Sequence, residues 1–237
     1  MTVEKVASPE GDAAKRKVGL AAAALVRSGM VVGLGTGSTA AFAIEELGRR
    51  VREEKLVLVG VPTSWSAAEL ARKAGIDVRA VNDVTQINLA FDNADKVDPN
   101  LSLIKKNGAA HTQEKIVATA AQRFVVVVDE SKIVRRLGVK WPVPLEVLAM
   151  ALHPVERALA RLGARTEVRK GGGKDGPVVT DLGNLVVDAK FDGIDDPAAL
   201  ARELDAIPGL VEHGLFVGLV DEVLVGSAGS GTVRTLQ

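Results

Sequence analysis

Short apolar runs alternate with longer segments of helical periodicity over the first half of the chain. The apolar runs are rich in valine, leucine and isoleucine, and they predict strands at residues 30–34, 56–61, 76–81, 87–91 and 124–128. The segments around them predict helices at residues 12–28, from about 39 to 52, 66–74 and 112–122. Because strands that alternate with helices form βαβ units, the pattern predicts an α/β fold with a mostly parallel sheet.

The pattern changes after Gly138, and Trp141-Pro142-Val143-Pro144 predicts a boundary because prolines interrupt regular structure. The following segments predict strand 145–150, helix 154–162, strand 164–169, a Gly-rich turn at 171–176, strand 178–180 continuing at 184–190, helix 197–206 and strand 210–217. This βαββαβ order is typical of ferredoxin-like domains. We therefore expect a Rossmann-like domain of residues 1–140 and 213–237, with a last strand at 219–225, and a smaller α+β domain of residues 141–212.

Composition excludes several classes of function. The 237 residues carry 30 basic and 30 acidic side chains, so no net charge favours nucleic acid or a membrane surface. The absence of cysteine excludes thiol catalysis and disulfides, and His111, His153 and His213 lack metal-ligand spacing. We expect no leader peptide, because no basic-then-apolar pattern opens the sequence, and no apolar run approaches the ~20 residues of a membrane span. We expect a cytoplasmic protein without a histidine-based metal site.

A loop of small and hydroxyl residues follows the first predicted strand. In Gly35-Thr36-Gly37-Ser38-Thr39 the backbone can approach a ligand closely, and the start of the next helix favours an anion. The dinucleotide fingerprint and the P-loop both fail here, because the third glycine and the lysine are missing. We predict a phosphate cradle for a small substrate, supported by a second hydroxyl loop at Pro62-Thr63-Ser64. The alternative is an ordinary turn with Ser38 as the helix N-cap.

Charged residues gather after the predicted strand 87–91. Asp92 and Asp95 could exchange hydroxyl protons, and Glu114 could remove a carbon-bound proton while Lys105 stabilises the resulting oxygen anion. A simpler reading makes the aspartates part of an Asx turn and Glu114 a helix-capping residue. Lys132 is a candidate phosphate ligand whose alternative is a solvated surface charge.

Several separate motifs, in order and in register, resemble the type A ribose-5-phosphate isomerases. They are Val32 to Thr39, Gly60 to Ser64, Asp92 to Asp95, Lys105 to Lys115, Val128 to Lys132, Pro142 to Val147, Thr180 to Asn184, Ile207 to Gly209 and Gly214 to Phe216. The resemblance extends from the first predicted helix to Gly226, which is almost the whole chain.

The resemblance implies interconversion of ribose 5-phosphate and ribulose 5-phosphate without a metal or cofactor. Glu114 resembles the base that moves a proton between C1 and C2 through a cis-enediolate. The residues that resemble groups for ring opening, hydroxyl-proton transfer and enediolate stabilisation are Asp92, Asp95 and Lys105. Those that resemble phosphate and sugar contacts are Thr36, Gly37, Ser38, Thr39 and Lys132, with Lys15 a weaker candidate. The family is usually dimeric or tetrameric.

The chain departs from the family pattern in two loops. Asn93 and Lys96 replace a glycine and a glutamate, and Lys106, Asn107 and His111 replace two glycines and a leucine. The added side chains could block the substrate or supply different contacts. Two alternatives therefore remain: a catalytically weak or silent homologue that binds a sugar phosphate, and an isomerase of another sugar phosphate.

Overall fold

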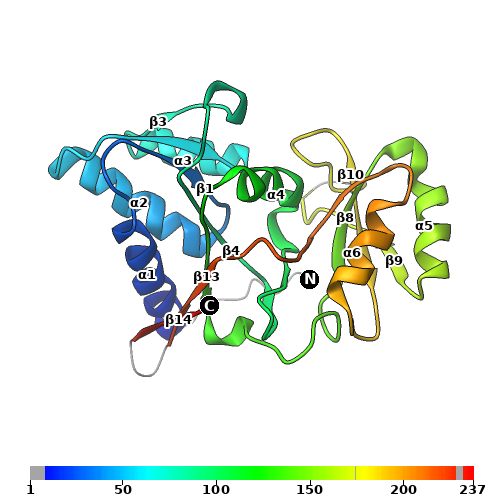
Figure 1. Ribbon diagram of the computed structural model, residues 1–237. Coiled ribbons are helices and arrows are strands. Elements are labelled where there is room, and N and C mark those ends of the chain that lie inside the picture. The colour runs from blue at the N-terminus through cyan, green and yellow to red at the C-terminus, as the bar shows by residue number, and fades with distance from the viewer. Residues whose placement is uncertain (1–8, 174, 228–231) are drawn as a thin grey trace. The chain divides into compact units, whose positions relative to one another are not determined.

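The computed structural model describes residues 9–173, 175–227 and 232–237 (Figure 1). Its contacts group the chain into two compact units, and each is described separately below. Within the described part, the larger unit contains residues 9–94, 113–132 and 219–237, and the smaller unit contains residues 95–112 and 133–218. The domain division predicted from the sequence, with boundaries at 140 and 213, stays a prediction. None of the helices in the described part is both long and apolar enough to span a membrane.

The larger unit is built on a seven-stranded sheet in the order β14-β13-β7-β4-β1-β2-β3. The strands are β1 (Met30–Leu34), β2 (Leu58–Pro62), β3 (Asp77–Val78), β4 (Leu89–Asn93), β7 (Phe124–Asp129), β13 (Glu222–Gly226) and β14 (Val233–Leu236). All neighbours are parallel except β13 and β14. The predicted mostly parallel α/β fold is confirmed, and the predicted last strand joins this sheet as β13. The edge strand β14 was missed.

Helices cover both faces of this sheet. They are α1 (Pro9–Ala24), α2 (Ser38–Glu53), α3 (Trp65–Lys73) and α4 (His111–Ala120, of which the first two residues belong to the smaller unit). Val32 and Leu34 of β1 point into a core formed with the first three helices. Gly33, between them, faces the other way and lies against Val117 of α4. Strand alternation thus places α1, α2 and α3 on one face and α4 on the opposite face.

The smaller unit contains a four-stranded antiparallel sheet in the order β11-β8-β10-β9. Its elements are β8 (Val143–Val147), α5 (Leu152–Arg161), β9 (Arg165–Val168), β10 (Leu185–Lys190), α6 (Pro197–Asp205) and β11 (Leu210–His213). Alternate apolar residues of β8 and β10 pack with both helices in one buried cluster. The βαββαβ order predicted from the sequence is confirmed. Three very short strands form a further sheet in this unit: β5 (Lys96–Val97), β6 (Leu103–Ile104) and β12 (Leu215–Phe216).

Four strand predictions need correction. The strand predicted at 145–150 already begins at Val143, because proline has backbone angles that suit a strand start. The strand predicted at 210–217 is broken at Gly214, whose N–H donates to the Pro144 carbonyl at 2.7 Å. A Cβ on Gly214 would lie 2.4 Å from the Lys105 carbonyl oxygen, so only glycine allows this crossing. The runs 76–81 and 178–180 shorten to Asp77–Val78 and to a single bridge at Val179.

Candidate functional site

The carboxyl ends of β1, β2, β4 and β7 meet at one edge of the larger sheet, because these strands are parallel. β1 lies between β2 and β4 in the sheet, so the chain leaves β1 on one side and later returns on the other. Such a reversal of strand order creates the crevice in which ligands of open α/β sheets bind. The loop after β1 lies at this reversal of strand order.

The loop after β1 is tied to both neighbouring strands. The Gly35 N–H donates to the Phe91 carbonyl at 2.9 Å, and the Thr36 N–H donates to Asp92 Oδ1 at 3.1 Å. The Thr36 hydroxyl lies 2.9 Å from Thr63 Oγ1 and donates to Ser64 Oγ at 2.7 Å. The two hydroxyl loops predicted from the sequence therefore meet at the same edge of the sheet.

The start of α2 presents backbone N–H groups at this edge. Gly37 is the N-cap with φ 105°, a conformation that suits glycine, and no side chain caps the helix. Ser38, which the sequence suggested as a possible N-cap, is instead the exposed first residue of α2, followed by the buried Thr39. A cavity of about 290 Å³ lies beside Gly37 and Ser38, between α2 and α3. Uncapped N–H groups beside a cavity suit an anionic ligand.

Two of the predicted acidic residues belong to this unit. Asp92 is buried, and its Oδ1 also accepts the Asn93 N–H at 2.8 Å. Glu114 lies in the first turn of α4 and is only 2% exposed. Because α4 precedes the parallel strand β7, its N-terminus lies at the carboxyl ends of the strands. Asp92, Glu114 and the hydroxyl loops thus share one edge of the sheet.

The two predicted phosphate-binding lysines differ in their surroundings. Lys132 ends a 3₁₀ turn (Glu130–Lys132) directly after β7, at the same edge of the sheet as the hydroxyl loops. Lys15 lies within α1, and its Nζ forms an ion pair with Asp12 at 3.2 Å.

Asp95 belongs to the smaller unit, where the loop after β6 holds it. Its Oδ2 accepts the Lys106 N–H at 2.6 Å and the Asn107 N–H at 2.9 Å. The Asn107 side-chain amide donates to Asp95 Oδ1. The sequence raised the question of whether Asn107 obstructs the loop. Within this unit, its side chain instead adds a third hydrogen bond to the carboxylate.

Backbone and side-chain contacts also fix the two lysines of this loop. Lys105 is 2% exposed, its N–H donates to the Gly214 carbonyl at 2.8 Å, and its Nζ lies 5.7 Å from the centre of the Phe216 ring. The Lys106 carbonyl accepts a hydrogen bond from Arg169 at 2.8 Å. Arg169 in turn pairs with Asp188 through two hydrogen bonds. The loop is therefore anchored at each of its first residues.

Comparison with known proteins identifies the family. A family model described as Ribose 5-phosphate isomerase A (phosphoriboisomerase A) matches residues 59–230. A curated ribose-5-phosphate isomerase A from Thermosynechococcus vestitus is 55% identical over 218 residues, which cover 92% of each chain. This chain belongs to the ribose 5-phosphate isomerase A family.

Solved structures of this family have the same fold. Ribose 5-phosphate isomerase A from Methanocaldococcus jannaschii is 48% identical, with a TM-score of 0.90 over 94% of this chain and 98% of that one. A D-ribose-5-phosphate isomerase solved in complex with phospho-erythronic acid is 44% identical, with a TM-score of 0.91 over 94% of this chain and 97% of that one. The resemblance stated from the sequence is confirmed.

Sequence reasoning gave no role to Glu146, a buried carboxylate in β8 of the smaller unit. Glu146 is 1% exposed. It accepts hydrogen bonds from the hydroxyls of Thr112 and Thr180 and from the side-chain amide of Asn184. The available signal was a glutamate inside an otherwise apolar strand, because such a carboxylate must find several donors to be buried. Glu146 joins the first turn of α4 to the turn before β10.

One group of side chains in the described residues has the spacing of metal ligands: Asp205, Glu212 and His213. His213 Nδ1 accepts the Leu215 N–H at 3.3 Å, which places the ring proton on Nε2. Nε2 lies 3.2 Å from Asp205 Oδ1 and can donate to it. Since both ring nitrogens are engaged, the geometry suits a structural histidine.

Proposed function

We propose that this protein interconverts ribose 5-phosphate and ribulose 5-phosphate by proton transfer without a metal. The observation that carries the proposal is the buried Glu114, in the first turn of α4 at the same sheet edge as the Thr36 loop. A carboxylate at that edge is placed to act on a ligand whose phosphate binds the loop. Membership in the ribose 5-phosphate isomerase A family supports the choice of substrate.

In the proposed reaction Glu114 removes the proton from C2 of the open-chain aldose. The C2–H electron pair forms the C1–C2 double bond of a cis-enediolate, and the carbonyl π electrons move to O1. The O2 proton then passes to O1, and Glu114 returns its proton to C1. The product is the 2-ketose, so no electron or atom is gained from outside.

The phosphate and the enediolate need different partners. We assign the phosphate to the N–H and hydroxyl groups of Thr36, Gly37, Ser38 and Thr39, and to Lys132. Lys15 stays a weaker candidate, since its ammonium pairs with Asp12.

Three residues are assigned to the sugar itself. A buried lysine suits stabilisation of the enediolate oxygen, and we give this role to Lys105. Asp92 and Asp95 would open the ring and exchange hydroxyl protons. Each aspartate is held by two backbone N–H groups, which fixes its orientation.

The test is turnover of ribose 5-phosphate in the presence of a chelator. Glu114→Gln should lower kcat by about 10²–10⁴-fold while binding persists, because the amide cannot accept the proton. In D₂O, deuterium should enter C1 of the product. Glu45→Gln, an exposed change on α2, is the matched control and should keep full activity. Loss of turnover with the chelator, or full activity in Glu114→Gln, would refute the mechanism.

The same experiment separates the alternatives. A silent sugar-phosphate binder would show ligand-induced thermal stabilisation without turnover. An isomerase of a different sugar phosphate would act on a hexose or tetrose phosphate and leave ribose 5-phosphate unchanged. The four proposed catalytic residues favour an active enzyme over the silent binder, and membership in the family favours ribose 5-phosphate over another sugar phosphate.

From the family resemblance we also propose a homodimer or homotetramer that acts in the cytoplasm, in the pentose phosphate pathway. Light scattering coupled to size-exclusion chromatography tests the oligomeric state directly. A monomer at micromolar concentration would contradict this part of the proposal.

A further inference from the structure

A pocket in the smaller unit is lined by residues that have no role in the proposed reaction. Its volume is about 360 Å³, and it is formed by the segment 134–141 together with Lys96 of β5. This volume is at the lower end of the range for small-molecule sites. The pocket thus has room for one small ligand.

Several of the residues that line this pocket are basic. Four of its side chains are cationic: Lys96, Arg135, Arg136 and Lys140. No carboxylate is among the described residues that line it. The whole chain has equal numbers of acidic and basic residues, so the pocket is a local excess of positive charge. Positive charge concentrated in a concave site attracts anions.

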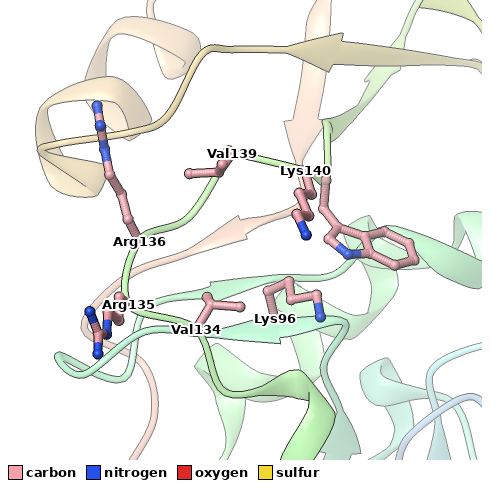
Figure 2. Close-up of a pocket in the computed structure, with 8 residues that line it drawn as sticks. Lys96, Val134, Arg135, Arg136, Val139 and Lys140 are labelled. Atoms are coloured by element: carbon pink, nitrogen blue, oxygen red, sulfur yellow. The ribbon is translucent and has the colours of Figure 1, made fainter.

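Two lysines face each other across the opening. Figure 2 shows Val139 and Lys140 on one side and Val134 and Lys96 on the other. Arg135 and Arg136 lie at one end, and their side chains point in opposite directions. An anion between Lys96 and Lys140 would therefore meet an ammonium group on each side and apolar surface from the two valines.

Trp141 holds further positive charge near this site. Lys96 Nζ lies 5.4 Å from the centre of the Trp141 ring, and Lys106 Nζ lies 5.6 Å from it. Cation–π contacts hold both ammonium groups against one ring, although like charges repel each other. A bound anion would lower this repulsion.

Two of the cationic side chains of the pocket have no ion-pair partner among the described residues, and a third has a weak one. Arg136 pairs with Asp195 at 2.8 Å, but the Asp195 side chain is 86% exposed, so the pair is weak. Lys106 Nζ lies 4.0 Å from Asp188, at the limit of an ion pair. Among the residues that the structure describes, Arg135 and Lys140 have no ion-pair partner. The charges of Arg135 and Lys140 are therefore available to a ligand.

We propose that this pocket binds a small anion that carries at least two phosphate charges, held between Lys96 and Lys140. The inference does not depend on the proposed isomerase activity. Val134 and Val139 give apolar surface for a ring attached to the phosphates, as in a nucleotide. Inorganic pyrophosphate and ADP are the probes, since both carry the charges and only ADP carries a ring.

The experiment uses Trp141 as a local reporter. The chain contains two tryptophans, and Trp65 on α3 is 65% exposed, so Trp65→Phe leaves Trp141 as the single fluorophore. Titration of this variant with pyrophosphate or ADP at low salt should change the Trp141 fluorescence with saturation. Added salt should weaken binding, because screening reduces the attraction.

Charge reversal locates the site. Lys140→Glu in the same background should weaken binding at least about tenfold, since it replaces a charge-assisted contact by repulsion. Lys190→Glu is the matched control: it makes the same charge change at an exposed position of β10 outside the pocket, and binding should hold. Tighter binding of ADP than of pyrophosphate would support the contact with the valines, and equal binding would support recognition of charge alone.

Two results would overturn the proposal. One is a Trp141 fluorescence that does not change with either probe at low salt, although its emission maximum shows that the variant is folded. The other is equal weakening by Lys140→Glu and Lys190→Glu, because that would show a non-specific response to net charge.

Discussion

Two loops of this protein hold an aspartate in the same way but are built from different residues. In the larger unit, Asp92 accepts the N–H groups of Thr36 and Asn93. In the smaller unit, Asp95 accepts the N–H groups of Lys106 and Asn107. The first loop depends on Gly35 and Gly37, whereas the second carries long side chains where the family pattern has glycine.

The difference follows from the space around each loop. A Cβ on Gly35 would lie 2.4 Å from Asp92 Cγ and 2.5 Å from the Phe91 carbonyl oxygen, so no side chain fits there. At Asn107 the side chain turns toward the carboxylate and donates to it. Glycine is thus required where a Cβ would overlap the carboxylate, and it is replaceable where the side chain can bind it.

The largest effect on stability should come from Gly35→Ala. The added methyl group overlaps a carboxylate and a backbone carbonyl, neither of which can move without breaking the strand ends. We expect a loss of about 3 kcal/mol in the free energy of unfolding. Gly172→Ala, where no atom lies within 4 Å of the new Cβ, is the control and should be close to neutral. Equal urea midpoints for the two variants would contradict the steric argument.

Removing one donor from Glu146 should have the next largest effect. Thr180→Val keeps the side-chain shape but removes a 2.7 Å hydrogen bond to a buried carboxylate. The expected loss is about 2 kcal/mol, because hydrogen bonds to charged groups are the stronger ones. Thr166→Val, at a half-buried position in β9, should cost far less. A loss at Thr180 no greater than at Thr166 would mean that Glu146 does not depend on this hydroxyl.

Substitutions at Asn107 test the comparison of the two loops directly. Asn107→Ala should cost about 1 kcal/mol, since it removes the amide donor but keeps the backbone N–H that Asp95 accepts. Asn107→Asp should cost more, because it places a second carboxylate against the first. Denaturant unfolding measures both.

Asn100→Ala is the matched control for these variants. The Asn100 backbone N–H donates to Asp98 in the same way, at 2.9 Å, and the substitution keeps this bond. We therefore expect little change. Asn107→Asp as stable as the wild-type protein would show that the amide does not bind Asp95.

The sequence predicted the long elements well because their patterns are local. β1 and β7 are apolar runs that stand out from the segments around them, and the βαββαβ order follows from helix and strand periodicity alone. Strands of two residues, such as β5 and β12, are too short to show any period. The break at Gly214 could not be predicted either, since it depends on contacts with Lys105 and Pro144, far away in the sequence.

The candidate site shows the same limit. The hydroxyl loops and the order of the acidic residues were readable, since they follow predicted strands. The donors to Glu146 come from positions 34 and 38 residues away, so no local pattern indicates them. The direction of the Asn107 side chain is also a tertiary property. From the sequence, the Asn107 side chain could either obstruct the loop or make a new contact. In the smaller unit it makes a hydrogen bond to Asp95.

The smallest effect should come from the partly buried ion pair between Glu46 and Arg49 on α2, where no glycine is involved. The hydrogen bond from Arg49 lowers the pKa of Glu46 below its ordinary value of 4.5. A carboxyl group whose pKa is lowered by folding stabilises the protein above its unfolded pKa, and this contribution is lost as the pH falls through the folded pKa. Glu46→Gln should therefore cost about 0.3 kcal/mol at neutral pH and nothing in acid. Thermal unfolding of the wild-type protein and of Glu46→Gln, from neutral to acidic pH, measures this stability difference. A difference that grows as the pH falls would refute the prediction.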